Sequence, residues 1–164
     1  MADHATQVIV IDAPIQACFD VATEFERYPE WVHDIKHVEV AERDDLARGV
    51  VVRFRTAAFG RSTAYTLRYD YSEAPAKLSW VEVEGDLTSK LDGQYVFAEA
   101  AAGAAGAPAD APDAAAGPAT EVTYTLEAEL KVPIPGFVKR RAEVWILHTA
   151  LRQLKARVET GAAG

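Results

Sequence analysis

The chain has 164 residues, of which 49% are hydrophobic and 26% charged, and its formal net charge is −8. Such values are typical of one globular domain with its own core, and a negative surface repels nucleic acid and anionic headgroups. No run of 18 apolar residues is present, so we expect no transmembrane segment.

Cysteine content and the first residues indicate the compartment. Cys18 is the one cysteine, which excludes an intramolecular disulfide. Residues 1–7 are polar, without a basic stretch followed by an apolar one, so no secretory signal is predicted. We therefore expect a cytoplasmic protein.

The chain begins with a predicted strand and a predicted helix. The β-branched run Gln7–Ile11 favours a strand, Asp12 is a suitable helix N-cap, and Pro14 is tolerated in a first turn. The apolar residues that follow share one helical face: Ile15, Cys18, Phe19 and Ala22. Cys18 is therefore expected to be a buried structural thiol.

A short aromatic segment follows, at residues 24–32. Pro29 prevents the first helix from continuing through it, so a second short helix is predicted. Phe25, Tyr28 and Trp31 give this piece a large apolar load that must pack against another element.

From residue 35 onward the hydrophobic period changes to two, which predicts a series of strands. In the best example, Thr63, Tyr65, Leu67, Tyr69 and Tyr71 face one way. We expect strands over 35–40, 49–58, 63–71, 77–83 and 87–97, with turns between them.

Residues 98–119 interrupt the strands. They are almost wholly Ala, Gly, Pro and Asp without periodicity, which predicts a disordered low-complexity insert. Strict alternation resumes over 122–132, so the insert is expected to form the tip of a hairpin whose two strands still pair.

The chain ends in a predicted helix from Gly136 to about Glu159. Seven residues step by three and four along it and predict one continuous stripe that packs on the sheet: Phe137, Arg140, Val144, Leu147, Leu151, Leu154 and Val158. Lys139, Arg140 and Arg141 form a basic cluster that we interpret as a solvated face.

Strands in series with helices at both ends predict an α+β fold. We expect a helix-grip fold, in which a curved antiparallel sheet of about seven strands wraps a long C-terminal helix. Two short helices follow the first strand, and residues 1–164 form a single domain.

Three segments resemble the START-like superfamily, also called the SRPBCC or birch-pollen-allergen-like fold. IDAPIQACFDVATEFERYPEWV (Ile11–Val32) is similar to the opening of its polyketide cyclase/dehydrase and coenzyme-Q-binding START branch. Gly93–Phe97 and the Val132–Pro135 approach to the last helix support the resemblance. It implies a seven-stranded sheet that grips a helix around a hydrophobic cavity for lipids, isoprenoid quinones, hormones or polyketides.

Candidate ligand contacts follow from placement and chemistry. The aromatic segment is a candidate lid, and tyrosines combine an apolar ring with a polar tip that suits an oxygen-bearing ligand. Arg140 on the last helix could bind a carboxylate, enolate or carbonyl, or else reach solvent. The predicted ligand-binding set is Phe25, Tyr28, Trp31, Phe54, Tyr65, Tyr69, Tyr95, Tyr124, Arg140 and Val144.

Catalytic and metal motifs are sparse. Glu82 and Glu84 fall on the same face of a strand and could both face solvent. His33 and His37 are four apart, but the segment passes into a strand and offers no third ligand, so neither a metal nor a cofactor is expected. His148 is expected to be a surface or core histidine.

Three functions remain open at this stage. The preferred one is binding or carrying a hydrophobic small molecule such as a lipid, an isoprenoid quinone or a polyketide. The second is a polyketide aromatase/cyclase or dehydratase, for which tyrosines and Arg140 could serve but no catalytic residue is assigned. The third is an interaction protein whose pocket is filled by its own side chains.

Overall fold

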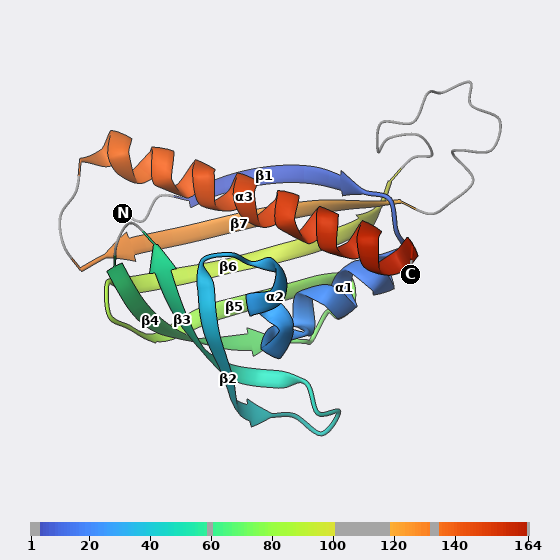
Figure 1. The fold of residues 1–164 in the computed structure, drawn as a ribbon, viewed down its shortest axis with the longest axis horizontal. Coiled ribbons are helices and arrows are strands. Elements are labelled where there is room, and N and C mark those ends of the chain that lie inside the picture. Colours follow the sequence, from blue (N-terminus) through green and yellow to red (C-terminus); the bar gives the residue numbers. More distant parts are fainter. Residues whose placement is uncertain (1–3, 59–60, 101–118, 132–134, 164) are drawn as a thin grey trace.

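The computed structural model describes residues 4–58, 61–100, 119–131 and 135–163. In this part of the chain, strands make up one antiparallel sheet, and helices lie between its first two strands and at its C-terminal end (Figure 1). The elements are β1 (His4–Ile11), α1 (Ile15–Thr23), η1 (Phe25–Arg27), α2 (Tyr28–Trp31), β2 (Ile35–Arg43), β3 (Gly49–Ala58), β4 (Arg61–Asp70), β5 (Lys77–Gly85), β6 (Thr88–Glu99), β7 (Thr120–Leu130) and α3 (Gly136–Ala163).

The seven described strands lie in the order β1-β7-β6-β5-β4-β3-β2. Strands β2 to β7 pair with their neighbours in sequence, whereas β1 adds to the far side of β7. This sheet, with the short helices after its first strand and the long helix at its end, confirms the predicted helix-grip fold. No helix within the described ranges is long and apolar enough to span a membrane.

The helices lie on one side of the sheet, with α1, η1 and α2 beside the second half of α3 (Figure 1). Helix α1 buries Cys18, Phe19 and Ala22, as its predicted face requires. Cys18 is fully buried, and burial raises the pKa of its thiol. The apolar face of α1 thus closes the end of the core below α3.

The start of α1 differs from the prediction. Its N-cap position is Pro14, and the predicted cap Asp12 lies two residues earlier. The backbone N–H of Asp12 instead donates to the carboxylate of Glu159 near the end of α3, over 2.8 Å. Lys155 reaches the same carboxylate and the carbonyl of Val10, each over 2.7 Å. The β1–α1 connection is therefore tied to α3 through side chains of the long helix.

Only the part of α3 from Leu147 onward packs as predicted. Its apolar positions are 2% exposed or less: Leu147, Leu151, Leu154 and Val158. In the first half, Phe137 is 62% and Val144 47% exposed, and Arg140 on the same stripe is also exposed. The predicted stripe therefore does not extend over the first turns of α3, whose apolar positions stay exposed although the helix as a whole packs on β1, α1 and β7.

The predicted insert is slightly shorter than expected. Strand β6 continues through Ala98 to Glu99, and β7 already begins at Thr120. Register is kept to the last pair, Glu99 with Thr120, and the N–H of Ala100 donates to the carbonyl of Ala119 over 2.9 Å. The two strands therefore pair as predicted, while residues 101–118 lie outside the described residues.

Candidate functional site

Aromatic rings cover the inner face of the sheet, on the side of α1 and α2. Antiparallel strands place directly opposite residues on the same face, so period-two aromatics in adjacent strands meet as pairs. The rings of Tyr95 and Tyr124 are 4.6 Å apart between centroids. The pairs formed in this way are Phe54 with Tyr65, Tyr69 with Trp80, and Tyr95 with Tyr124.

The short helices add three rings from above. The Phe25 ring lies 4.5 Å from that of Tyr69, and the Tyr28 ring 5.9 Å from that of Phe54. Trp31 packs on Tyr28 at 5.0 Å and stays half-buried at the margin. The aromatic segment that sequence analysis singled out thus lies against the tyrosine-bearing strands.

Trp80 completes this surface, and sequence analysis missed it. It contacts Tyr69, Tyr95 and Tyr124 at centroid distances of 5.6, 5.3 and 5.8 Å. Its cross-strand partner is Gly93, and a Cβ on Gly93 would lie 2.6 Å from Trp80 Cζ2. The alternation of Leu78 and Trp80 in the sequence was the signal that could have placed it on the inner face.

The phenolic hydroxyls on this face are poorly satisfied. Among the described residues, Tyr65, Tyr69, Tyr95 and Tyr124 make no hydrogen bond through their hydroxyls, whereas Tyr28 donates to the Ala22 carbonyl. Tyr69 and Tyr124 are each only 7% exposed. Their hydroxyl oxygens are not themselves fully buried, so each has space beside it that water or a bound molecule can occupy. We call these four residues the tyrosine cluster.

The tyrosine cluster stays protonated over the physiological range. Burial raises the pKa of all four residues. The negative charges that Tyr28 and the other three members of the cluster would carry raise the pKa of Tyr69 further, so these phenolic ends lie near one another. Each hydroxyl is therefore available as a hydrogen-bond donor.

A carboxyl group adjoins the cluster. Opposite Thr66 and Leu67, strand β5 places Glu84 and Glu82, so Val83 is an extra residue in a β-bulge. Glu82 pairs with the buried Leu67 and shares its inner face, while Val83 and Glu84 are exposed. The expectation that Glu82 and Glu84 share a solvent face is wrong, because the bulge reverses the alternation between them.

Glu82 is held by its neighbours. Thr88 donates its hydroxyl to Glu82 Oε2, and the backbone N–H of Glu82 donates to Asp92 Oδ1 over 2.9 Å. Desolvation raises the pKa of the Glu82 carboxyl, the Thr88 hydrogen bond opposes this, and Asp92 adds to it. The charge of Glu82 in turn contributes to the raised pKa of Tyr65.

The structure does not bring Arg140 and Val144 to the tyrosine cluster. Both lie on the exposed first half of α3. The other eight predicted ligand contacts lie together on the inner face or directly above it. His33 and His37 are exposed, and the described residues contain no group of three potential metal ligands.

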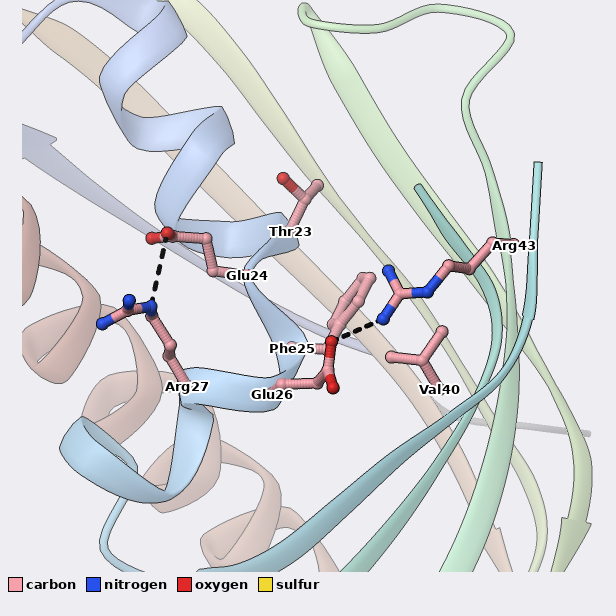
Figure 2. Close-up of a pocket in the computed structure, with 7 residues that line it drawn as sticks. All are labelled: Thr23, Glu24, Phe25, Glu26, Arg27, Val40 and Arg43. Carbon is pink, nitrogen blue, oxygen red and sulfur yellow. Dashed lines mark hydrogen bonds and ion pairs between the residues drawn. The ribbon is translucent and has the colours of Figure 1, made fainter. Parts of the chain in front are cut away.

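A separate hollow of about 220 Å³ lies between η1 and β2 (Figure 2). Its charged side chains neutralise one another: Arg43 pairs with Glu26 at 2.5 Å and Arg27 with Glu24 at 3.8 Å. Phe25 borders it, but the ring contacts of Phe25 are with the aromatic surface. This hollow is polar and internally paired, so it is a poor site for a hydrophobic molecule.

The curved antiparallel sheet, its C-terminal helix and its ring-covered inner face define the START-like ligand-binding fold. The chain belongs to the family described as polyketide cyclase / dehydrase and lipid transport, whose model matches residues 11–155. The resemblance drawn from the sequence is thereby confirmed.

Solved structures agree with this assignment. A START superfamily protein from Mycobacterium smegmatis has a TM-score of 0.80 at 20% identity, covering 96% of this chain and 97% of that one. The Zhui aromatase/cyclase from Streptomyces sp. R1128 has a TM-score of 0.71 at 14% identity, with 97% and 94% covered. The di-domain ARO/CYC BexL from the BE-7585A biosynthetic pathway has a TM-score of 0.66 at 18% identity, with 96% and 46% covered.

No curated protein matches the sequence. At these identities the structural likeness establishes the fold alone, so the function of this chain has to be argued from its own residues.

Proposed function

We propose that this protein binds or carries a hydrophobic small molecule, such as a lipid, an isoprenoid quinone or a polyketide, on the inner face of its sheet. The molecule lies against the hydroxyl ends of the tyrosine cluster, beside the rings of Phe25, Tyr28 and Trp31. Family membership supports a ligand of this kind, and the nature of the side chains supports an apolar body with oxygen groups.

One observation carries the proposal. The tyrosine cluster presents four hydroxyls inside an aromatic surface, and none has a hydrogen-bond partner among the described residues. Their oxygens are not fully enclosed by protein atoms, so they remain free to donate to a bound molecule. Carbonyl, ether or hydroxyl oxygens of a bound molecule would accept, while its hydrocarbon part would pack on the rings.

The expected affinity follows from ligand size. A ligand of about 25 heavy atoms at about 0.3 kcal/mol per atom gains about 7.5 kcal/mol, which corresponds to micromolar binding. That strength suits a carrier, because it permits both loading and release.

A polyketide aromatase/cyclase or dehydratase is the second candidate. The family description and the fold shared with the Zhui aromatase/cyclase support it. Such an enzyme needs a donor for an enolate oxygen, which the tyrosine cluster would supply, and a general base. Turnover of a poly-β-ketone thioester by the purified protein separates this candidate from a pure carrier.

Ligand binding is tested first with the protein as purified from its own host. Native mass spectrometry should find a retained apolar molecule, and a menaquinone with two isoprene units should bind the emptied protein in calorimetry. The double variant Tyr69→Phe/Tyr124→Phe keeps the rings and loses two donors, so we expect affinity for this quinone to fall about tenfold.

Tyr71→Phe is the matched control. Tyr71 lies outside the tyrosine cluster, and its hydroxyl already donates to the Gly49 carbonyl over 2.6 Å. Quinone affinity should therefore be unchanged in this variant. Absence of any retained ligand together with absence of quinone binding would reject the proposal and favour an interaction protein with a filled interior.

A further inference from the structure

We propose that Glu82 and Tyr65 form a polar subsite that selects ligands carrying a hydroxyl or enol group at this end of the inner face. The inference rests on the proposed function, because it assigns one end of the same ligand.

The bulge at Val83 creates the subsite. Without the extra residue, alternation from the inward Trp80 would place Glu82 and Glu84 inward and Gly85 outward. With it, both Glu82 and Gly85 pair with inner-face residues, opposite Leu67 and Tyr65. Glu82 thus keeps the inward position that alternation gives it, while the bulge turns Glu84 to the opposite face and brings Gly85 inward beside Glu82.

Gly85 provides the room for the carboxylate. A Cβ on Gly85 would overlap Glu82 Oε2 and would lie 2.5 Å from Thr88 Oγ1. The Thr88 hydroxyl orients the carboxylate by donating to Oε2. Among the described residues no hydrogen bond to Oε1 is found, so this oxygen can accept from another group.

Tyr65 supplies the complementary donor. Its hydroxyl has no hydrogen-bond partner within the described ranges, yet Glu82 is near enough to affect its ionisation. A hydroxyl group both accepts and donates a hydrogen bond. A ligand hydroxyl could therefore accept from Tyr65 and donate to Glu82, whereas an ether or ketone could use Tyr65 only.

The other charged groups near Glu82 do not pair with its carboxylate. Asp92 accepts from the Glu82 backbone, and its side chain lies near Lys90, which also pairs with Glu127 at 2.9 Å. Lys131 acts on Glu82 only at long range and is exposed. No cation among the described residues forms an ion pair with Glu82.

Two probes of the same ring system separate the roles of the two residues. In calorimetry, 2-naphthol both donates and accepts through its oxygen, whereas 2-methoxynaphthalene only accepts. We expect the wild-type protein to bind 2-naphthol about tenfold more tightly, a factor that corresponds to 1.4 kcal/mol. Glu82→Leu should lose this preference by weakening 2-naphthol binding alone, and Tyr65→Phe should weaken both probes.

Glu82→Gln covers the case in which the leucine variant does not fold, and it should reduce the preference because a neutral acceptor is weaker. Glu84→Gln is the matched control and should bind like the wild type, since Glu84 is exposed on the opposite face. A preference that survives both Glu82 substitutions, or an equal loss in Glu84→Gln, would overturn the subsite and leave the proposed function standing. Failure of the wild-type protein to bind either naphthalene would count against both.

Discussion

Trp80 can lie flat on the inner face of the sheet because its partner across the strands, Gly93, has no side chain. A Cβ at Gly93 would approach Trp80 Cζ2 to 2.6 Å and the backbone carbonyl of Thr125 to 2.8 Å. The carbonyl belongs to the β6–β7 ladder and cannot move without breaking it. The aromatic surface thus depends on one glycine.

Gly93→Ala should therefore destabilise the protein by about 1–3 kcal/mol, the usual cost of overpacking. Urea unfolding measures this cost, and the tryptophan emission of the protein should shift as the Trp80 ring is displaced. Gly136→Ala is the matched control: a Cβ there meets nothing within 4 Å, so stability should be unchanged or slightly higher. Equal stability of the two variants would contradict the close packing of Trp80.

Glu82, on the same face, makes the stability of the folded protein depend on pH. Desolvation raises the pKa of its carboxyl in the folded state. The folded protein therefore holds this proton more tightly than the unfolded chain does. The associated stability is fully present below the ordinary glutamate pKa, and it is lost as pH rises through the raised, folded-state pKa.

The variant Glu82→Gln cannot lose this proton, so its stability relative to the wild type should increase as pH rises from the ordinary glutamate pKa through the raised pKa of the folded state. Urea unfolding at a series of pH values measures the difference. In Glu84→Gln the same difference should stay flat, because Glu84 is exposed on the other face. A flat difference for Glu82→Gln would show that its carboxyl is not desolvated.

At the scale of elements, α3 has two unlike halves. Its second half is buried and anchored to β1 and α1 through Lys155 and Glu159. Desolvation tends to raise the pKa of the Glu159 carboxyl, but the hydrogen bonds from Lys155 and from the backbone of Asp12 outweigh it and lower this pKa. The first half carries the same apolar spacing, yet Phe137 and Val144 remain exposed. Periodicity alone therefore does not report how much of a helix is buried.

Alanine substitutions should report this difference along α3. Leu147→Ala removes a fully buried side chain and should cost about 2–5 kcal/mol. Val144→Ala, one turn earlier on the same stripe, should change stability by no more than about 0.5 kcal/mol. Urea unfolding of both variants is the measurement, and similar losses would mean that the first half of α3 packs in solution.

At the scale of the whole molecule, strands β6 and β7 form a long hairpin within the sheet. Strands β6 and β7 stay in register from Thr88 with Leu130 to Glu99 with Thr120, with a shift between Thr88 and Lys90. Pairing thus continues to the edge of residues 101–118. The architecture therefore does not require these residues for the register of the two strands.

Replacing residues 101–118 by four residues of Gly and Ser should preserve the fold and increase stability by about 1 kcal/mol, because a shorter loop costs less entropy to close. Thermal and urea unfolding measure the effect, with quinone binding as the readout of the site. A large loss of stability or of quinone affinity would show that the insert contributes contacts of its own.

The amino-acid sequence by itself determined the order of elements, the family and the inward direction of most aromatic residues. These features depend on short-range patterns: a period of two in strands, a period near four in helices, and an opening segment with family-specific residues. Tyr65, Tyr69, Tyr95 and Tyr124 could be assigned to one face for this reason, since alternation within each strand is local.

Only the tertiary structure decided which of these residues meet and what lies beside them. The bulge at Val83 depends on the pairing of β4 with β5, and it turns Glu84 outward and Gly85 inward beside Glu82. Trp80 depends on Gly93 in another strand, and the exposure of Arg140 depends on what lies beneath the first half of α3. Cross-strand register and helix placement are set by contacts between distant segments, which no local pattern contains.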